Sequence, residues 1–180
     1  MSRARTLKEI EDRKSRYSRY TWFAVVALLV GVFVGIGIYI ALGLPNFFLA
    51  DIVVSSLALA SFLISVVAMA VGYLSKSGVV HGEYESAVRL SSAAIALNAL
   101  SLALSLIAYT PPMSDLLRTI CNTYAVAATA AGACFSQYYA MSLGGFGAYT
   151  ALQAAALAFY YLARRTLEGL LAYYAPRRLK

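Results

Sequence analysis

Charged residues and histidine are scarce in this chain of 180 residues: Asp, Glu, Lys and Arg make up 13% of it, and histidine occurs once. Soluble domains average about 25% charged residues. Hydrophobic residues reach 61%, and the mean hydropathy is +0.71. This composition excludes an ordinary soluble domain. Long uncharged runs recur along the chain, as is typical of a polytopic membrane protein.

Ionisable side chains are missing from the interior of every apolar run. Proton relays, voltage sensors and carriers of charged substrates place such groups inside their spans, so the pattern argues against all three. A single histidine, His81, cannot supply two axial haem ligands, and no lysine lies in a run to form a Schiff base. His81 with Glu83 and Glu85 is a weak surface metal motif, and a solvated loop is favoured. No metal or cofactor is expected.

The chain has two cysteines, Cys121 and Cys134. If both lie on one helix, thirteen residues at 1.5 Å per residue separate them by about 19.5 Å, which is beyond disulfide reach. We therefore expect two buried free thiols that pack as small residues. No Ser, His and Asp set is apparent, so no catalytic site is predicted and the protein is not expected to be an enzyme.

The charge pattern predicts an all-α fold, a transmembrane helix bundle between residues 21 and 163. Pro45, Pro111 and the glycines of 144–147 are natural breaks in the apolar runs. Each run between breaks is a candidate span of a hydrocarbon core about 30 Å thick. The five predicted spans are 22–44, 52–74, 88–109, 119–143 and 148–163.

Four spans are a serious alternative to five. The basic residues of 1–20, with Lys76 and Arg89, favour a cytoplasmic N-terminus in a cell membrane. Five spans would then place the basic residues of 164–180 outside, against the positive-inside rule. Four spans would place them inside, but would require one of the last two weak segments to be re-entrant or superficial.

Both termini resemble interfacial helices. Residues 1–20 form a basic, weakly amphipathic leader. In the tail 164–180, Leu167, Leu170, Leu171 and Tyr174 follow helical spacing and favour docking on lipid or on a partner. Aromatic residues prefer the headgroup level. The predicted interfacial anchors are Trp22, Tyr160, Tyr161, Tyr173 and Tyr174.

Small residues are the main packing signal inside the spans, because close backbone approach drives helix association in lipid. Gly31 and Gly35 form a GxxxG step that Gly43 continues, and Ala128 and Gly132 lie in the Ala-rich fourth span. The last two predicted spans suit protein contact better than lipid. The sequence therefore predicts a non-catalytic structural or accessory subunit of a membrane assembly. Its expected partners are the bilayer and membrane proteins or copies of itself, without nucleic acid.

Four amide side chains interrupt the apolar spans: Asn98, Asn122, Gln137 and Gln153. Hydrogen bonds between helices are their simplest role, worth about 0.6 to 2 kcal/mol each. A polar path lined by these amides is the alternative. It would make the protein a channel or carrier for a small neutral or apolar solute.

Overall fold

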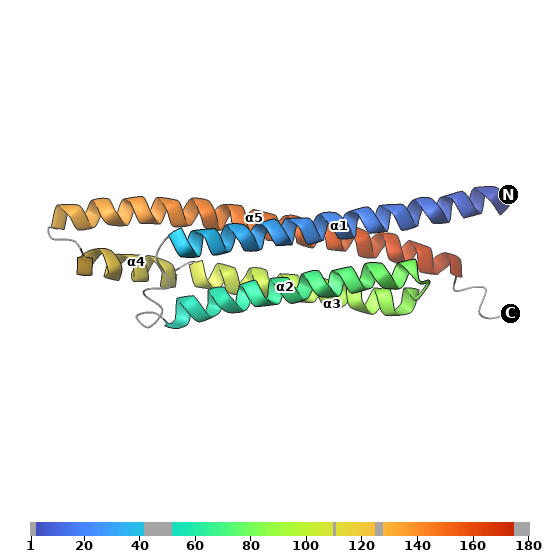
Figure 1. Ribbon diagram of the computed structural model, residues 1–180, viewed down its shortest axis with the longest axis horizontal. Coiled ribbons are helices and arrows are strands. Elements are labelled where there is room, and N and C mark those ends of the chain that lie inside the picture. Colours follow the sequence, from blue (N-terminus) through green and yellow to red (C-terminus); the bar gives the residue numbers. More distant parts are fainter. Residues whose placement is uncertain (1–2, 42–51, 110, 125–127, 175–180) are drawn as a thin grey trace.

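The computed structural model describes residues 3–41, 52–109, 111–124 and 128–174, and over these ranges the chain is helical with no strand. The helices are α1 (Arg3–Ala41), α2 (Ile52–Val80), α3 (Tyr84–Tyr109), α4 (Pro111–Tyr124) and α5 (Ala128–Tyr174). They form one elongated bundle (Figure 1).

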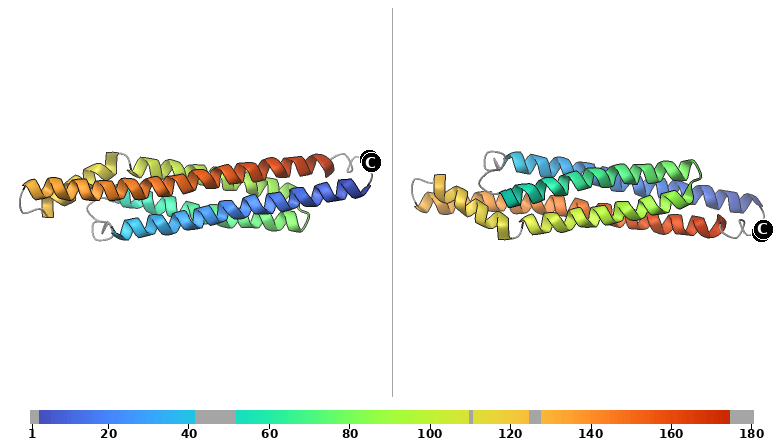
Figure 2. Two further views of the ribbon diagram at one scale, coloured as in Figure 1. Left: turned by 90° about the horizontal axis from the view of Figure 1, so that it is seen from above. Right: turned by 90° about the horizontal axis from the view of Figure 1, so that it is seen from below.

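The chain passes along this bundle in four segments: α1, α2, α3 continued by α4, and α5 (Figures 1 and 2). The start of α1, the turn between α2 and α3, and the end of α5 lie together at one end, which we call the basic end. The other end carries α4 and the start of α5, and we call it the disulfide end. Segments α1 and α3 run toward the disulfide end, whereas α2 and α5 run back.

The prediction of separate spans at 119–143 and 148–163 is wrong. Helix α5 continues through the glycines of 144–147, and the chain turns back between α4 and α5 instead. A methyl group at Gly145 would overlap the side chain of Ile38. Glycine is needed here for close approach of α1 to α5, not to end a helix. The path agrees in its number of segments with the four-span alternative.

The terminal regions do not form separate interfacial helices as predicted. Residues of the leader continue without a break into α1, and those of the tail belong to α5. Tyr17 is buried, and it packs with Leu167 and Leu170 against Val79 of α2 and Ala87 of α3. The apolar stripe of the tail therefore faces other helices of the same chain, because these supply an apolar surface that the sequence pattern could not locate.

The buried positions repeat at alternating spacings of four and three residues. In α2 the repeating positions are 58, 61, 65, 68, 72, 75 and 79, and in α3 they are 87, 91, 94, 98, 101, 105 and 108; Phe62 of α2 is buried outside this repeat. This heptad spacing is typical of helices that coil around one another with a left-handed twist. Apart from Val79 and Asn98, every residue at these positions is Ala, Ser or Gly.

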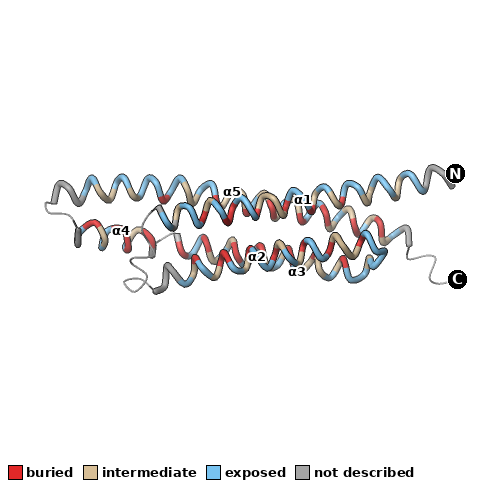
Figure 3. The backbone as a smooth tube through the Cα atoms, in the orientation of Figure 1, coloured by how far each residue is buried: buried red, intermediate tan, exposed pale blue. Residues whose placement is uncertain are grey.

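Large apolar side chains lie on the outside instead. Phe33 is 67% exposed, Leu63 58% and Ile107 54%, and Figure 3 shows the buried residues confined to the inward faces. By length and composition, three stretches are able to cross a membrane: Leu7–Ile38, Ser56–Val80 and Tyr84–Asn122. A small-residue core beneath a large apolar surface is compatible with a membrane protein.

Replacing Gly72 of α2 tests this close packing. An added Cβ would lie 2.6 Å from Cε1 and 2.8 Å from Cζ of the Tyr160 ring. We expect Gly72→Ala to destabilise the protein by about 1 to 3 kcal/mol through overpacking. The matched control is Gly37→Ala, since Gly37 has no atom within 4 Å of its added Cβ. Thermal unfolding in detergent measures both, and equal melting temperatures would contradict the packing described.

Candidate functional site

A network of uncharged polar side chains lies in the core, where α2, α3 and α5 meet. The Gln153 amide donates to Ser65 Oγ and to Ser101 Oγ, each at 3.0 Å. Ser101 Oγ donates to the Ser61 carbonyl at 2.8 Å, and the Tyr149 hydroxyl lies 2.9 Å from Ser61 Oγ. All five side chains are buried. Hydrogen bonds thus join three helices at one level without any charge.

Asn98 extends this network, in which some buried oxygen atoms have no hydrogen-bond partner in the described part of the chain. Its Nδ2 donates to the Gln153 backbone carbonyl at 3.1 Å. Among the described residues, Asn98 Oδ1, Gln153 Oε1 and Thr150 Oγ1 are buried and have no hydrogen-bond partner. Buried acceptors of this kind favour a hydrogen-bond donor such as water.

The structure brings together two of the four predicted amides and leaves the other two apart. Asn98 and Gln153 are fully buried and bonded to each other's helix. Asn122 of α4 and Gln137 of α5 are exposed, toward the disulfide end. The four amides therefore do not line one continuous path.

Tyrosines of α1 and α5 make further polar contacts toward the basic end. The Tyr160 hydroxyl donates to the Ala68 carbonyl at 3.2 Å. Ser75 Oγ donates to the Ala87 carbonyl at 2.7 Å, so the Tyr17 hydroxyl donates to Ser75 Oγ. Tyr160 is 1% exposed, and its prediction as an interfacial anchor is wrong, because Gly72 leaves room for its ring inside the bundle.

The other predicted anchors are placed differently. Trp22 is 51% exposed, with Lys76 Nζ 5.4 Å from the centre of its ring, and Tyr161 is also exposed. Both lie near the basic end. Tyr173 and Tyr174 end α5, and their side chains lie outside the described residues.

The predicted packing residues fall into two groups. Gly31 lies against Leu152 and Tyr149 of α5, and Gly35 lies against the Phe62 ring of α2. Both therefore serve packing within the chain. Gly132 is exposed, with nothing within 4 Å of an added Cβ. Gly43 and the side chain of Ala128 lie outside the described residues.

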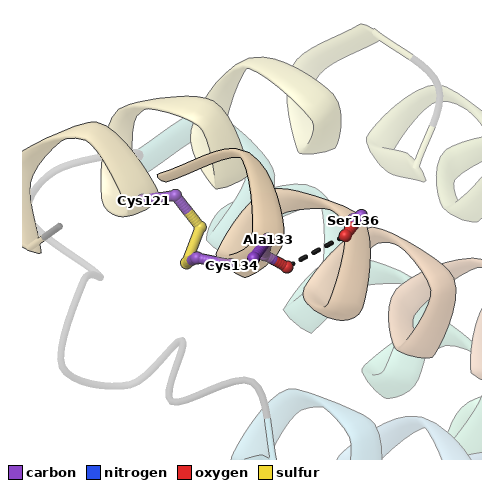
Figure 4. The surroundings of a disulfide bond; sticks show 4 residues. All are labelled: Cys121, Ala133, Cys134 and Ser136. Carbon is purple, nitrogen blue, oxygen red and sulfur yellow. Dashed lines mark hydrogen bonds between the residues drawn. A yellow bond between two sulfur atoms is a disulfide. The ribbon is translucent and has the colours of Figure 1, made fainter. Parts of the chain in front are cut away.

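Cys121 and Cys134 form a disulfide with their Cα atoms 5.8 Å apart, so the prediction of two free thiols is wrong (Figure 4). The prediction placed both on one helix. In the structure, Cys121 belongs to α4 and Cys134 to the antiparallel start of α5. Apolar side chains of both helices also pack together, including Leu117 and Phe135. The disulfide therefore ties the two helices that extend beyond α1 and α2 (Figure 1).

The part of the chain that the structure describes contains no group of three or more His, Cys, Asp or Glu placed to hold a metal ion. His81 lies exposed after α2, where its Nδ1 is 2.8 Å from the Ser77 carbonyl oxygen. The chemistry available in the core is therefore neutral hydrogen bonding.

Replacing Gln153 tests the importance of the network. We expect Gln153→Leu to lower the free energy of unfolding by about 1 to 2 kcal/mol, because the hydroxyls of Ser65 and Ser101 lose a shared donor. Gln137→Leu is the matched control, since Gln137 is exposed on the same helix. Unfolding in detergent, followed by circular dichroism, compares the two. A control loss as large as that of Gln153→Leu would refute a specific role for the network.

No family model, curated protein or solved structure matches this chain. Its function has to be inferred from its own residues: the buried network, the outward faces of the helices and the distribution of charge.

Proposed function

We propose that the protein is a non-catalytic integral membrane subunit with four passes, which assembles with a second copy of itself through the outward face of α5. The main observation behind this proposal is that the exposed side chains of α5 differ from those of the other helices. The outward faces of α1, α2 and α3 expose large apolar side chains. Between Gly144 and Ala158, by contrast, the only exposed residues of α5 are Ala and Gly.

This face of α5, here called the Ala/Gly seam, follows heptad spacing. Its six residues are Ala140, Gly144, Gly147, Ala151, Ala154 and Ala158, and all are exposed. Nothing lies within 4 Å of a Cβ added at Gly144 or Gly147. Met141 and Leu143 are exposed beside the first part of the seam. From residue 140 to residue 158 the helix rises by 18 steps, or about 27 Å. A second helix can therefore approach its backbone closely.

A second copy of this chain suits the seam. A two-fold axis along the bundle places the same face of α5 on both sides of the contact, so small residues meet small residues throughout. Heptad spacing matches the geometry of a helix pair with a left-handed twist. Small side chains offer lipid little surface, and α5 is also not among the stretches apolar enough to cross a membrane by composition.

Charge and redox chemistry support one orientation, with the basic end in the cytoplasm. Among the residues whose side chains are described, the disulfide end holds one basic residue, Arg118. The basic end holds nine: Lys8, Arg13, Lys14, Arg16, Arg19, Lys76, Arg89, Arg164 and Arg165. Basic residues are enriched on the cytoplasmic side, and disulfides persist in oxidising compartments. Both rules favour the same direction and a cytoplasmic N-terminus.

A bulky side chain in the seam tests the assembly. We expect the wild-type protein in mild detergent to be a dimer by native mass spectrometry, and Gly147→Leu to weaken the dimer at least about tenfold by blocking backbone approach. Gly37→Leu is the control, because Gly37 is an equally open glycine on α1. A strictly monomeric wild-type protein, without a partner from native membranes, would refute the subunit hypothesis. A different protein bound at the seam would replace the second copy with a heterologous partner.

Cysteine labelling tests the orientation. After reduction, a membrane-impermeant maleimide added to intact cells should label Cys134, which is partly exposed. In a Cys121→Ser, Cys134→Ser background, Ser86→Cys should react only after permeabilisation, since Ser86 is exposed at the basic end. The reverse pattern would show the opposite orientation.

A further inference from the structure

A groove between α1 and α5 at the basic end has the composition of a site for an anion. It encloses a cavity of about 270 Å³. Its lining consists of Arg13, Arg16, Tyr20, Leu162, Arg165 and Thr166. Three guanidinium groups thus line it without a carboxylate.

Arg165 gives the groove its net positive charge, because the other two arginines are paired with acids. Glu9 pairs with Arg13 at 3.2 Å, and Asp12 pairs with Arg16. Each acid lies one helical turn before its partner in α1. Among the described residues, the ion pairs at this end do not include Arg165, whereas the neighbouring Arg164 pairs with Glu168 at 2.9 Å.

One guanidinium is held in place by packing. Arg13 Nη1 lies so close to Gly169 of α5 that a Cβ there would overlap it. The side chain of Arg13 is only 32% exposed. Because Gly169 has no side chain, the Arg13 guanidinium fits between the two helices. Its charge is therefore held in position before any ligand binds.

The groove changes from charged to apolar toward the middle of the bundle. Positions 13, 16, 20 and 23 follow one face of α1, and 166, 162 and 159 follow the facing stripe of α5. The lining therefore passes from arginines to Tyr20 and Leu162. One turn further along the same two faces, beyond the cavity, lie Phe23 and Phe159, whose rings are 5.5 Å apart. A free anion would make no contact with the apolar residues.

We propose that this groove binds the phosphate of an anionic phospholipid, with its acyl chains along the Phe23 and Phe159 rings. Arginine forks bind phosphate oxygens in pairs, and basic pockets between spanning helices suit anionic headgroups on the cytoplasmic side. This proposal rests on the membrane orientation proposed above. It does not depend on the Ala/Gly seam.

Lipid retention by the full chain in detergent tests the site. Phosphatidylglycerol, phosphatidylcholine or inorganic phosphate is titrated, and bound molecules are counted by native mass spectrometry. We expect one retained phosphatidylglycerol per chain, about tenfold tighter than phosphatidylcholine. Inorganic phosphate at equal concentration should not displace it.

Two double variants remove equal charge from the basic end. Arg16→Gln with Arg165→Gln should weaken phosphatidylglycerol binding about tenfold or more, whereas Lys8→Gln with Arg89→Gln should change it less than about twofold. Helix content and melting temperature show whether each double variant folds. If the first one does not, the variant Arg16→Lys with Arg165→Lys replaces it and should retain part of the affinity.

Three results would overturn the proposal. Equal weakening by both double variants would show only diffuse surface attraction, and equal retention of phosphatidylcholine would show no preference for anionic lipid. Displacement by inorganic phosphate would show a site for a free anion. Because binding is measured per chain, a monomeric protein with intact lipid binding would refute the dimer alone. A dimer without lipid binding would refute this site alone.

Discussion

The close approach of helix backbones is the constraint on which the rest of this structure depends. Inward positions of α2 and α3 are almost all Ala, Ser or Gly. Some large side chains fit in the core where a glycine faces them: Gly72 faces Tyr160, and Gly35 faces Phe62. In lipid, helices gain little from hiding apolar surface from one another, so packing contact and hydrogen bonding hold them together. The bundle uses both.

Short inward side chains also explain the position of the hydrogen bonds. With serine at 61, 65 and 101, hydroxyl groups of α2 and α3 lie within bonding distance of one another and of α5. Longer apolar residues would separate the helices and break these bonds. Because an unpaired polar group is costly in a medium without water, the network also favours one register of α5 against α2 and α3.

The two ends of the bundle differ in chemistry, and this difference gives the molecule a direction. One end gathers arginines and lysines from α1, α2, α3 and α5, whereas the other end is joined by the bond between Cys121 and Cys134. The return of α5 to the basic end brings Arg165 beside Arg13 and Arg16. The same folding step leaves the Ala/Gly seam on the outside, where no part of the described chain covers its glycines.

Composition and charge along the sequence determined that the protein is helical, apolar and built around small residues, because these properties are local. They also singled out four amide side chains, of which the structure buries Asn98 and Gln153 and exposes Asn122 and Gln137. The heptad spacing of Ala, Ser and Gly in α2 and α3 was present in the sequence and could have identified the inward faces. Only the tertiary structure decided where the chain turns back, since an uncharged Ala-rich run has no local signal that separates a break from a close contact. Gly145 is an example: glycine is needed at this position because the Ile38 side chain of another helix lies against it. Three further features depend on which segments become neighbours: the disulfide, the burial of Tyr160 and the arginine groove. Contacts between segments distant in sequence are decided by packing.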